Sequence, residues 1–315
     1  MAERADHLLQ RLEWTVLRRL DGLLQGDYRT LLRGGGVDLA DLREYQLHDD
    51  VRHIDWNVTA RLEAPYVRQF LEDRDLTAWF LLDLSGSLDF GSGETTKMAV
   101  SSGFVGALAR VITRHGNRVG AVLYHRQIDD VLMPGTSRLH VMNLLERMRR
   151  PAPKATGPAT GTALADLLNG AAGVIRRRSL VFVVSDFVSQ PGWEDALARL
   201  ARRHEVVAVR LFDPAEMALP DVGLVTVEDA ETGEQLLIDA ADPGFRERYA
   251  ALADAAEEQL RDALGRAGCD TLELATDDDL LDALLRFADL RRRRARLKSS
   301  PRVAGHLARA AEVLA

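Results

Sequence analysis

The chain has 315 residues, which allows one large domain or two ordinary ones and excludes a small scaffold held together by disulfides. Apolar residues make up 46% of the sequence and charged residues 28%, a composition typical of a soluble globular protein rather than a disordered one. The formal net charge of -7 argues against a non-specific nucleic-acid binder, and the single cysteine, Cys269, leaves no disulfide framework or cysteine-based zinc cluster and is expected to be an inert core thiol.

The amino-terminal region differs in pattern from the rest of the chain. It carries an amphipathic stretch that predicts a helix over residues 8–24, a glycine run at 34–36 and a charged stretch at 43–61. Its first residues do not form a secretory signal, and no apolar run in the sequence approaches the roughly 18 residues of a membrane span. We therefore expect a soluble, cytoplasmic protein with no membrane span.

Short apolar runs rich in β-forming residues predict five strands, at 78–82, 118–124, 180–184, 205–211 and 270–274. Helical periodicity between and after them predicts helices around 104–112, 164–175, 193–201 and 280–285. This alternation favours an α/β fold with an open, doubly wound, mostly parallel sheet. Residues 127–132 follow the second strand after a break too short for a crossover helix, so they predict one antiparallel edge strand.

These patterns divide the chain into three parts. Residues 1–76 form an amino-terminal extension, residues 77–290 form the α/β domain, and residues 291–315 form a basic helical tail. The Pro, Gly and Thr residues at 151–161 predict a loop inside the α/β domain, because the strand pattern resumes after them.

Oxygen-bearing side chains follow two of the predicted strands, at the edge where open α/β sheets bind ligands. Asp83, Ser85 and Ser87 alternate through one turn and can direct three oxygens to one point. Magnesium and manganese ions prefer such hard oxygen ligands and retain several waters. The sequence therefore predicts one Mg²⁺ or Mn²⁺ site formed by Asp83, Ser85, Ser87, Thr162 and Asp186.

The same residues resemble the metal-ion-dependent adhesion site of von Willebrand factor A-type domains. The resemblance is carried by Asp-Leu-Ser-Gly-Ser at 83–87, by a loop threonine at 162 and by a strand-end aspartate at 186. It implies that the two serines and Thr162 contact the metal directly. It also implies that Asp83 and Asp186 supply charge and act through water.

A second resemblance covers almost the whole chain. Residues 43–45, 49–56 and 60–61 are similar to the signature of the bacterial domain of unknown function 58 family, and the ending at 274–277 also matches. Many members of that family are encoded beside MoxR-type AAA+ ATPases, which implies such an ATPase and its client protein as partners. The chain lacks the membrane hairpin of longer relatives, which favours a soluble protein.

The charged signature also has an interpretation from its chemistry alone. An ion-pair network around Tyr45 and Trp56 can be built from Arg43, Asp49, Asp50, Arg52, Asp55 and Arg61. We interpret this stretch as a structural network or an interaction surface. The alternatives are catalysis and a second metal site, for which the candidate ligands are His48, His53 and Asp55.

Two other motifs imitate functional sites. Residues 91–97 resemble a phosphate-binding loop, but Thr96 stands where the second glycine belongs and Met98 where the hydroxyl ligand belongs. The arginine run at 291–296 resembles a nucleic-acid patch, but cations at the end of a helix are explained by its dipole. We therefore expect neither nucleotide binding nor nucleic-acid binding.

These observations favour a metal-dependent protein-protein interaction module, not an enzyme. One metal position would be left to water, and an Asp or Glu of the partner would displace that water. The alternative function is a Mg²⁺-dependent hydrolase that uses the same cation site. The sequence places no obvious general base or nucleophile beside that site.

Overall fold

The computed structural model describes residues 36–45, 54–62, 64–73, 77–151, 162–228 and 234–287. Residues 36–277 of this set belong to one compact unit and residues 278–287 to another, and each unit is described by itself. The helix expected at 8–24, the boundary at 75–76 and the tail at 291–315 lie outside the described residues.

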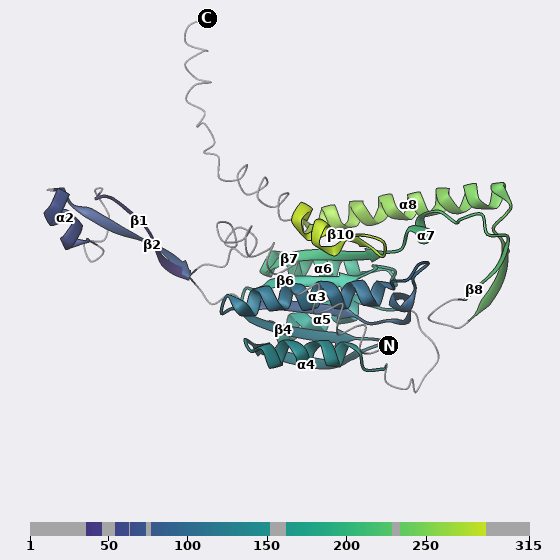
Figure 1. The fold of residues 1–315 in the computed structure, drawn as a ribbon, viewed down its shortest axis with the longest axis horizontal. Helices are drawn as coiled ribbons and strands as arrows, with labels where there is room; N and C mark the ends of the chain where they lie inside the picture. Colours follow the sequence, from purple (N-terminus) through teal and green to yellow (C-terminus); the bar gives the residue numbers. More distant parts are fainter. Residues whose placement is uncertain are drawn as a thin grey trace, which may run out of the picture. The chain divides into compact units, whose positions relative to one another are not determined.

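The centre of the larger unit is a six-stranded sheet in the order β10-β7-β6-β3-β4-β5 (Figure 1). Its strands are β3 (Thr77–Asp83), β4 (Arg118–Tyr124), β5 (Ile128–Gly135), β6 (Leu180–Ser185), β7 (Glu205–Phe212) and β10 (Asp270–Ala275). Neighbouring strands are parallel except β4 and β5, which are antiparallel. The predicted fold class, with its single antiparallel edge strand in this sheet, is confirmed.

Helices cover both faces of this sheet. They are α3 (Lys97–Arg114), α4 (Arg138–Met148), α5 (Leu164–Val174), α6 (Trp193–Arg203), the short α7 (Pro214–Met217) and α8 (Pro243–Ala267). Side chains of α5, α6 and α8 pack on one face, while Phe104 of α3 packs on Phe80 and Phe182 of the other face. Because successive side chains of a strand point to opposite faces, a sheet covered twice needs the continuous apolar strands seen in the sequence.

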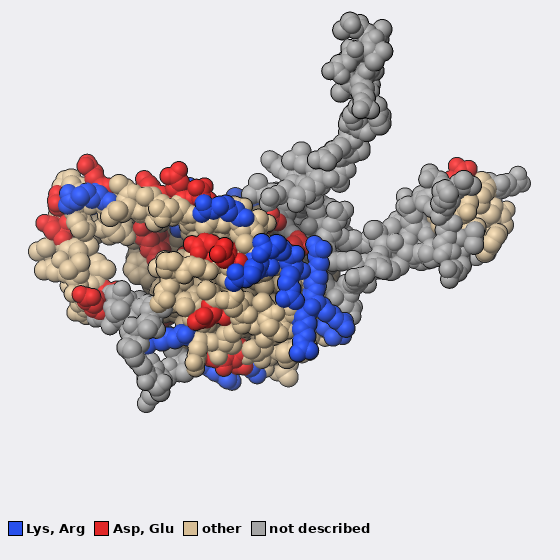
Figure 2. Space-filling model, turned by 180° about the vertical axis from the view of Figure 1, so that it is seen from behind, with Lys and Arg blue, Asp and Glu red and all other residues tan. Residues whose placement is uncertain are grey.

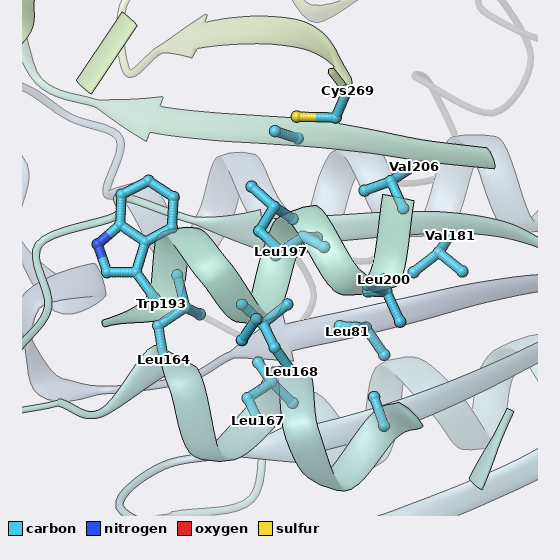
Figure 3. Close-up of a cluster of buried hydrophobic side chains, with 14 of the residues drawn as sticks. Leu81, Leu164, Leu167, Leu168, Val181, Trp193, Leu197, Leu200, Val206 and Cys269 are labelled. Carbon is cyan, nitrogen blue, oxygen red and sulfur yellow. The ribbon is translucent and has the colours of Figure 1, made fainter. Parts of the chain in front are cut away.

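The core between the sheet and helices α5 and α6 holds the site-bearing strands in place (Figure 3). Leucines of both helices point toward Leu81 of β3 and Val181 of β6, all of them buried. Burying one such side chain contributes about 1.5–3 kcal/mol. Cys269 lies in the same cluster, where burial raises its pKa to about 11, so it has the inert thiol expected from the sequence.

Two antiparallel hairpins were not predicted. One pairs β1 (Gly36–Glu44) with β2 (Tyr66–Asp73), and α2 (Trp56–Leu62) lies between them in the chain. The other pairs β8 (Leu224–Glu228) with β9 (Gln235–Asp239) and joins α7 to α8. None of the helices in the described ranges is long and apolar enough to cross a membrane.

The charged signature falls only partly on described residues. Asp49, Asp50, Arg52, His48 and His53 lie outside them. Asp55 is buried and accepts a hydrogen bond from the backbone N–H of Val58, so it caps the start of α2. Trp56 is 70% exposed, and the ion-pair network expected around it stays a prediction, because most of its charged residues lie outside the described ones.

Candidate functional site

The first part of the candidate site is the turn that follows β3 in the middle of the sheet. Asp83 is fully buried, and its Oδ1 accepts the Ser85 N–H at 3.0 Å while its Oδ2 accepts the Ser185 hydroxyl at 2.7 Å. The turn continues into a single 3-10 turn, η2 (Gly86–Asp89), whose N-cap is Ser85. The Oγ atoms of Ser85 and Ser87 lie 3.2 Å apart, so the alternation in the sequence brings both hydroxyls together.

The second part follows the neighbouring strand β6. The Oδ1 of Asp186 accepts the N–H of Val188 at 3.0 Å. Phe187, between them, has a φ of 61°, a left-handed conformation that is unusual for an aromatic residue. Its N–H donates to Ser185 Oγ, and its buried ring packs against Trp193 with a centroid distance of 5.2 Å. These contacts hold the strained residue and thereby fix the direction of Asp186.

Thr162 is buried and lies two residues before α5. Its carbonyl accepts hydrogen bonds from the Ser189 hydroxyl at 3.0 Å and the Gln190 N–H at 2.9 Å, which ties it to the loop after β6. On the other side, Tyr124 accepts the N–H of Ala163 at its hydroxyl and the N–H of Leu84 at its carbonyl. Tyr124 therefore contacts both the Thr162 loop and the turn after β3.

The two carboxylates influence each other electrostatically. The pKa of Asp83 is raised to about 6, first by burial and then by the negative charge of Asp186, while hydrogen bonds from Ser185 and Ser85 act in the opposite direction. Within the described part of the chain, Asp83 bonds to these two serines and makes no ion pair. The Asp83 carboxyl is thus a buried group that pairs with no cation among the described residues.

A lysine that sequence reasoning assigned to an imitation phosphate loop belongs to the site. Lys97 Nζ lies 2.9 Å from Asp186 Oδ2 and 2.6 Å from Glu216 Oε1, and the side chains of Lys97 and Asp186 are each only 2% exposed. Burial acts to lower the pKa of the ammonium, but the two carboxylates outweigh this and raise it. No local sequence signal could have found the pair, because 89 residues separate Lys97 from Asp186.

A third aspartate at the same sheet edge was also missed. Asp213 follows β7 and is fully buried, and it accepts hydrogen bonds from Ser92, from the Thr276 hydroxyl and from the N–H of Ala215. Burial alone would raise its pKa, but the Ser92 and Thr276 hydrogen bonds lower it. The signal in the sequence was an aspartate at the end of an apolar run, as at the other two positions.

The donor set fits a hard cation better than a zinc ion. In the described ranges, no group of three or more His, Cys, Asp and Glu side chains is placed to hold a metal. The predicted set instead combines hydroxyl oxygens with two carboxylates, which suits Mg²⁺ or Mn²⁺ and not the nitrogen and sulfur preference of zinc. Lys97 compensates only one of the two buried carboxylates, so the site keeps a negative charge for a cation.

A cavity of about 490 Å³ begins at Asp186 and extends between α6 and α8. Its walls include the rings of Phe187, Trp193 and Phe212 and the side chain of Leu260. Charged side chains, among them Arg210, Glu216 and Glu257, line the same cavity, so a space of mixed polarity adjoins the Asp186 side of the candidate metal site.

Comparison with known proteins gives a family and several relatives. Residues 41–259 match the family described as "Protein of unknown function DUF58". The uncharacterized proteins Rv1480 of Mycobacterium tuberculosis and Mb1516 of Mycobacterium bovis are each 36% identical to this chain over 285 residues, which covers 90% of this chain and 89% of theirs.

Solved structures of low sequence identity resemble the chain in part. BatB from Bacteroides thetaiotaomicron gives a TM-score of 0.45 at 13% identity and covers 69% of this chain and 99% of its own. The SpRpn10 VWA domain gives a TM-score of 0.38 at 13% identity and covers 68% of this chain and 95% of its own.

Proposed function

The chain belongs to the DUF58 family, and we propose that it is a metal-dependent protein-protein interaction module rather than an enzyme. The observation that carries this proposal is the cluster of hydroxyls and carboxylates at the ends of β3 and β6, with the Ser85 and Ser87 oxygens 3.2 Å apart. Such oxygens suit an open cation site, and His115, His125, His140 and Cys269 bond to partners outside the cluster. Recognition of a partner therefore explains the side chains present better than a reaction does.

In this proposal the hydroxyls of Ser85, Ser87 and Thr162 contact Mg²⁺ or Mn²⁺ directly. Asp83 and Asp186 contribute their charge through water, which agrees with the protein hydrogen bonds that their oxygens already accept. The bound metal supplies one coordination position that water holds until a partner arrives. An aspartate or glutamate of the partner displaces that water, so affinity depends on the metal and on the partner's carboxylate.

The partner we propose is a MoxR-type AAA+ ATPase together with its client protein, for which this chain acts as an adaptor or co-factor in complex assembly or maturation. Family membership supports an ATPase of this class, because many members of the family are encoded beside such enzymes. The cavity next to Asp186 supports a protein segment as the ligand, since its lining combines charged residues with Phe187, Trp193 and Leu260, which offer an apolar surface for a neighbouring side chain.

One observation favours a Mg²⁺-dependent hydrolase. Asp83 has a pKa raised to about 6, and a carboxyl group tuned in this way is a candidate general base. However, Asp83 is fully buried, and both of its oxygens accept hydrogen bonds from Ser85 and Ser185. A group held in this way is poorly placed to take a proton from a substrate, so we keep the interaction module as the proposed function.

The test is a binding assay between the purified chain and a MoxR-type ATPase from the same genome, in Mg²⁺ and in excess chelator. We expect binding in Mg²⁺ only, and we expect Ser85→Ala and Thr162→Ala to abolish it. Thr113→Ala is the matched control, because its hydroxyl bonds to the backbone at the far end of α3. Binding that persists in chelator and in both site variants would place the interaction elsewhere. Phosphoester hydrolysis that needs Mg²⁺ and is lost in Asp83→Ala would establish the hydrolase.

A further inference from the structure

Lys97 is a fixed positive charge next to the candidate metal site. It is the first residue of α3, which Thr96 caps, and its backbone N–H donates to the carbonyl of Phe90 at 2.9 Å. Its ammonium contacts Asp186, Glu216 and the face of the Phe90 ring, and among the described residues it bonds to neither the site serines nor Asp83. The ammonium therefore contacts one of the five predicted metal-site residues, Asp186, and not the site serines.

The charges around the candidate metal site determine how Lys97 affects binding there. With Asp83, Asp186 and Glu216 ionised, one ammonium leaves two negative charges uncompensated, and a divalent cation makes the loaded site neutral. Without Lys97 the loaded site would keep one negative charge, which repels a carboxylate. The Glu216 side chain is 29% exposed, so solvent screens its charge more than that of Asp186.

Resting on the proposed function, we infer that Lys97 makes the metal-loaded site selective for an anionic partner group. Its charge repels the metal and so weakens metal affinity, and the same charge attracts a carboxylate that binds at the open metal position. Unit charges within about 10 Å in a partly buried site change affinities by on the order of tenfold. Lys97 thus lowers the affinity of the site for the metal and raises the affinity of the metal-loaded site for a carboxylate.

The experiment measures both affinities in the full chain with Mn²⁺ and acetate as probes. Mn²⁺ binding is followed by the electron paramagnetic resonance of free Mn²⁺, and acetate binding by its effect on water relaxation at the bound ion. In Lys97→Met at pH 8, we expect Mn²⁺ to bind on the order of tenfold more tightly and acetate on the order of tenfold more weakly. A lysine that only supports the loop predicts that both affinities fall together.

Glu216→Gln is the matched variant of opposite sign. It removes the negative charge on the other side of the ammonium, while glutamine can still accept the Asp213 N–H that Glu216 Oε2 accepts at 2.9 Å. We expect weaker Mn²⁺ binding and tighter acetate binding, by a smaller factor than in Lys97→Met. This variant also tests the inference if Lys97→Met does not fold.

The outcomes separate this inference from the proposed function. If the unchanged chain binds no Mn²⁺, the proposed function fails and the role of Lys97 falls with it. If the unchanged chain binds Mn²⁺ and acetate, but the variants move the two affinities in the same direction or leave them unchanged, only the inference about Lys97 is wrong. Opposite shifts that reverse sign between the two variants support it.

Discussion

At the scale of single residues, Asp83 combines burial with a nearby like charge, and this lowers the folding stability of the metal-free chain at high pH. Its pKa in the folded chain is about 6 against an ordinary 3.8, so the folded state favours the protonated carboxyl. The stability linked to this group is therefore full below pH 3.8 and is lost as the pH rises through 6. At pH 8 the loss amounts to up to about 3 kcal/mol in the absence of a cation.

The first prediction is that Asp83→Asn stabilises the metal-free protein at pH 8 while it abolishes metal binding. Asparagine keeps the shape and can still accept the Ser85 N–H, but it carries no charge to bury. We expect the free energy of unfolding in urea with chelator to rise by up to about 3 kcal/mol at pH 8 and to change little at pH 4. Calorimetry with Mn²⁺ checks the loss of binding.

A destabilised Asp83→Asn variant at pH 8 would contradict this prediction. It would mean that Asp83 is a structural group whose charge the fold satisfies without a metal. Ser185→Ala is a useful comparison, because it removes a hydrogen bond to Asp83 and leaves the charge in place. We expect that variant to be less stable at pH 8 than the unchanged chain, by about 1–3 kcal/mol.

The five predicted site residues were found by a pattern in one turn, by their places next to predicted strands and helices, and by a family resemblance, whereas Lys97 offers none of these signals. Asp83, Ser85 and Ser87 were placed together because alternation in a tight turn is a local property. The role of Lys97 depends on contacts between the start of α3 and the residues that follow β6 and β7. The local motif at 91–97 suggested only a phosphate-binding loop and gave no sign of these contacts. The left-handed backbone of Phe187 was equally hidden, because an aromatic residue gives no signal for that conformation.

At the scale of elements, Asp213 joins three segments at the sheet edge. It follows β7, bonds to Ser92 in the loop between η2 and α3, and bonds to Thr276 directly after β10. The second prediction is that Asp213→Ala lowers the free energy of unfolding by about 3 kcal/mol at pH 7, because several donors lose a buried, charged acceptor. Urea unfolding measures the loss.

The pH dependence of this effect has a definite sign. The pKa of Asp213 is lowered in the folded chain, so its contribution is full above its ordinary value of 3.8 and is lost as the pH falls through the lowered value. The difference between Asp213→Ala and the unchanged chain should therefore narrow in strong acid. Thr276→Val removes one hydroxyl only and should cost about 1 kcal/mol, and an equal cost for both variants would show that Asp213 is not the joining residue.

Among the elements, the buried strands were predictable and the hairpins were not. Strands β3 and β6 are covered on both faces, so their sequences are short continuous apolar runs with a clear length. The β8–β9 hairpin instead places Val227, Leu236 and Leu237 in exposed positions, and its short strands are not embedded in the central sheet. A strand that buries neither face does not need alternating apolar and polar residues. Its sequence therefore lacks the pattern by which a strand is recognised.

At the scale of the larger unit, exposed arginines gather at the amino ends of the sheet strands, and three buried aspartates lie at the carboxyl ends. Figure 2 shows Lys and Arg side chains collected toward one end of the face turned away in Figure 1. Exposed arginines at 176–178 precede β6, and those at 202–203 end α6, so they lie at the amino ends of the strands. Asp83, Asp186 and Asp213 lie at the carboxyl ends, and this separation favours a cation at that edge.

The last prediction concerns the stability of the larger unit as a whole. Mg²⁺ that binds the folded chain only should raise the free energy of unfolding by about 2.7 kcal/mol at one hundred times its dissociation constant, or roughly 5–10 °C in melting temperature. The rise should be smaller at pH 5 than at pH 8, because a proton on Asp83, whose pKa is about 6, competes with the metal. Differential scanning calorimetry of the full chain measures both values.

Two variants decide whether this stabilisation comes from the proposed site. Ser85→Ala and Thr162→Ala should melt cooperatively with chelator, because the buried strands supply the packing, and should gain little from Mg²⁺. An unchanged gain in both variants would place the metal elsewhere in the chain. Loss of cooperative melting on chelation alone would instead make the metal part of the structure, and an open position for a partner's carboxylate would then have no support.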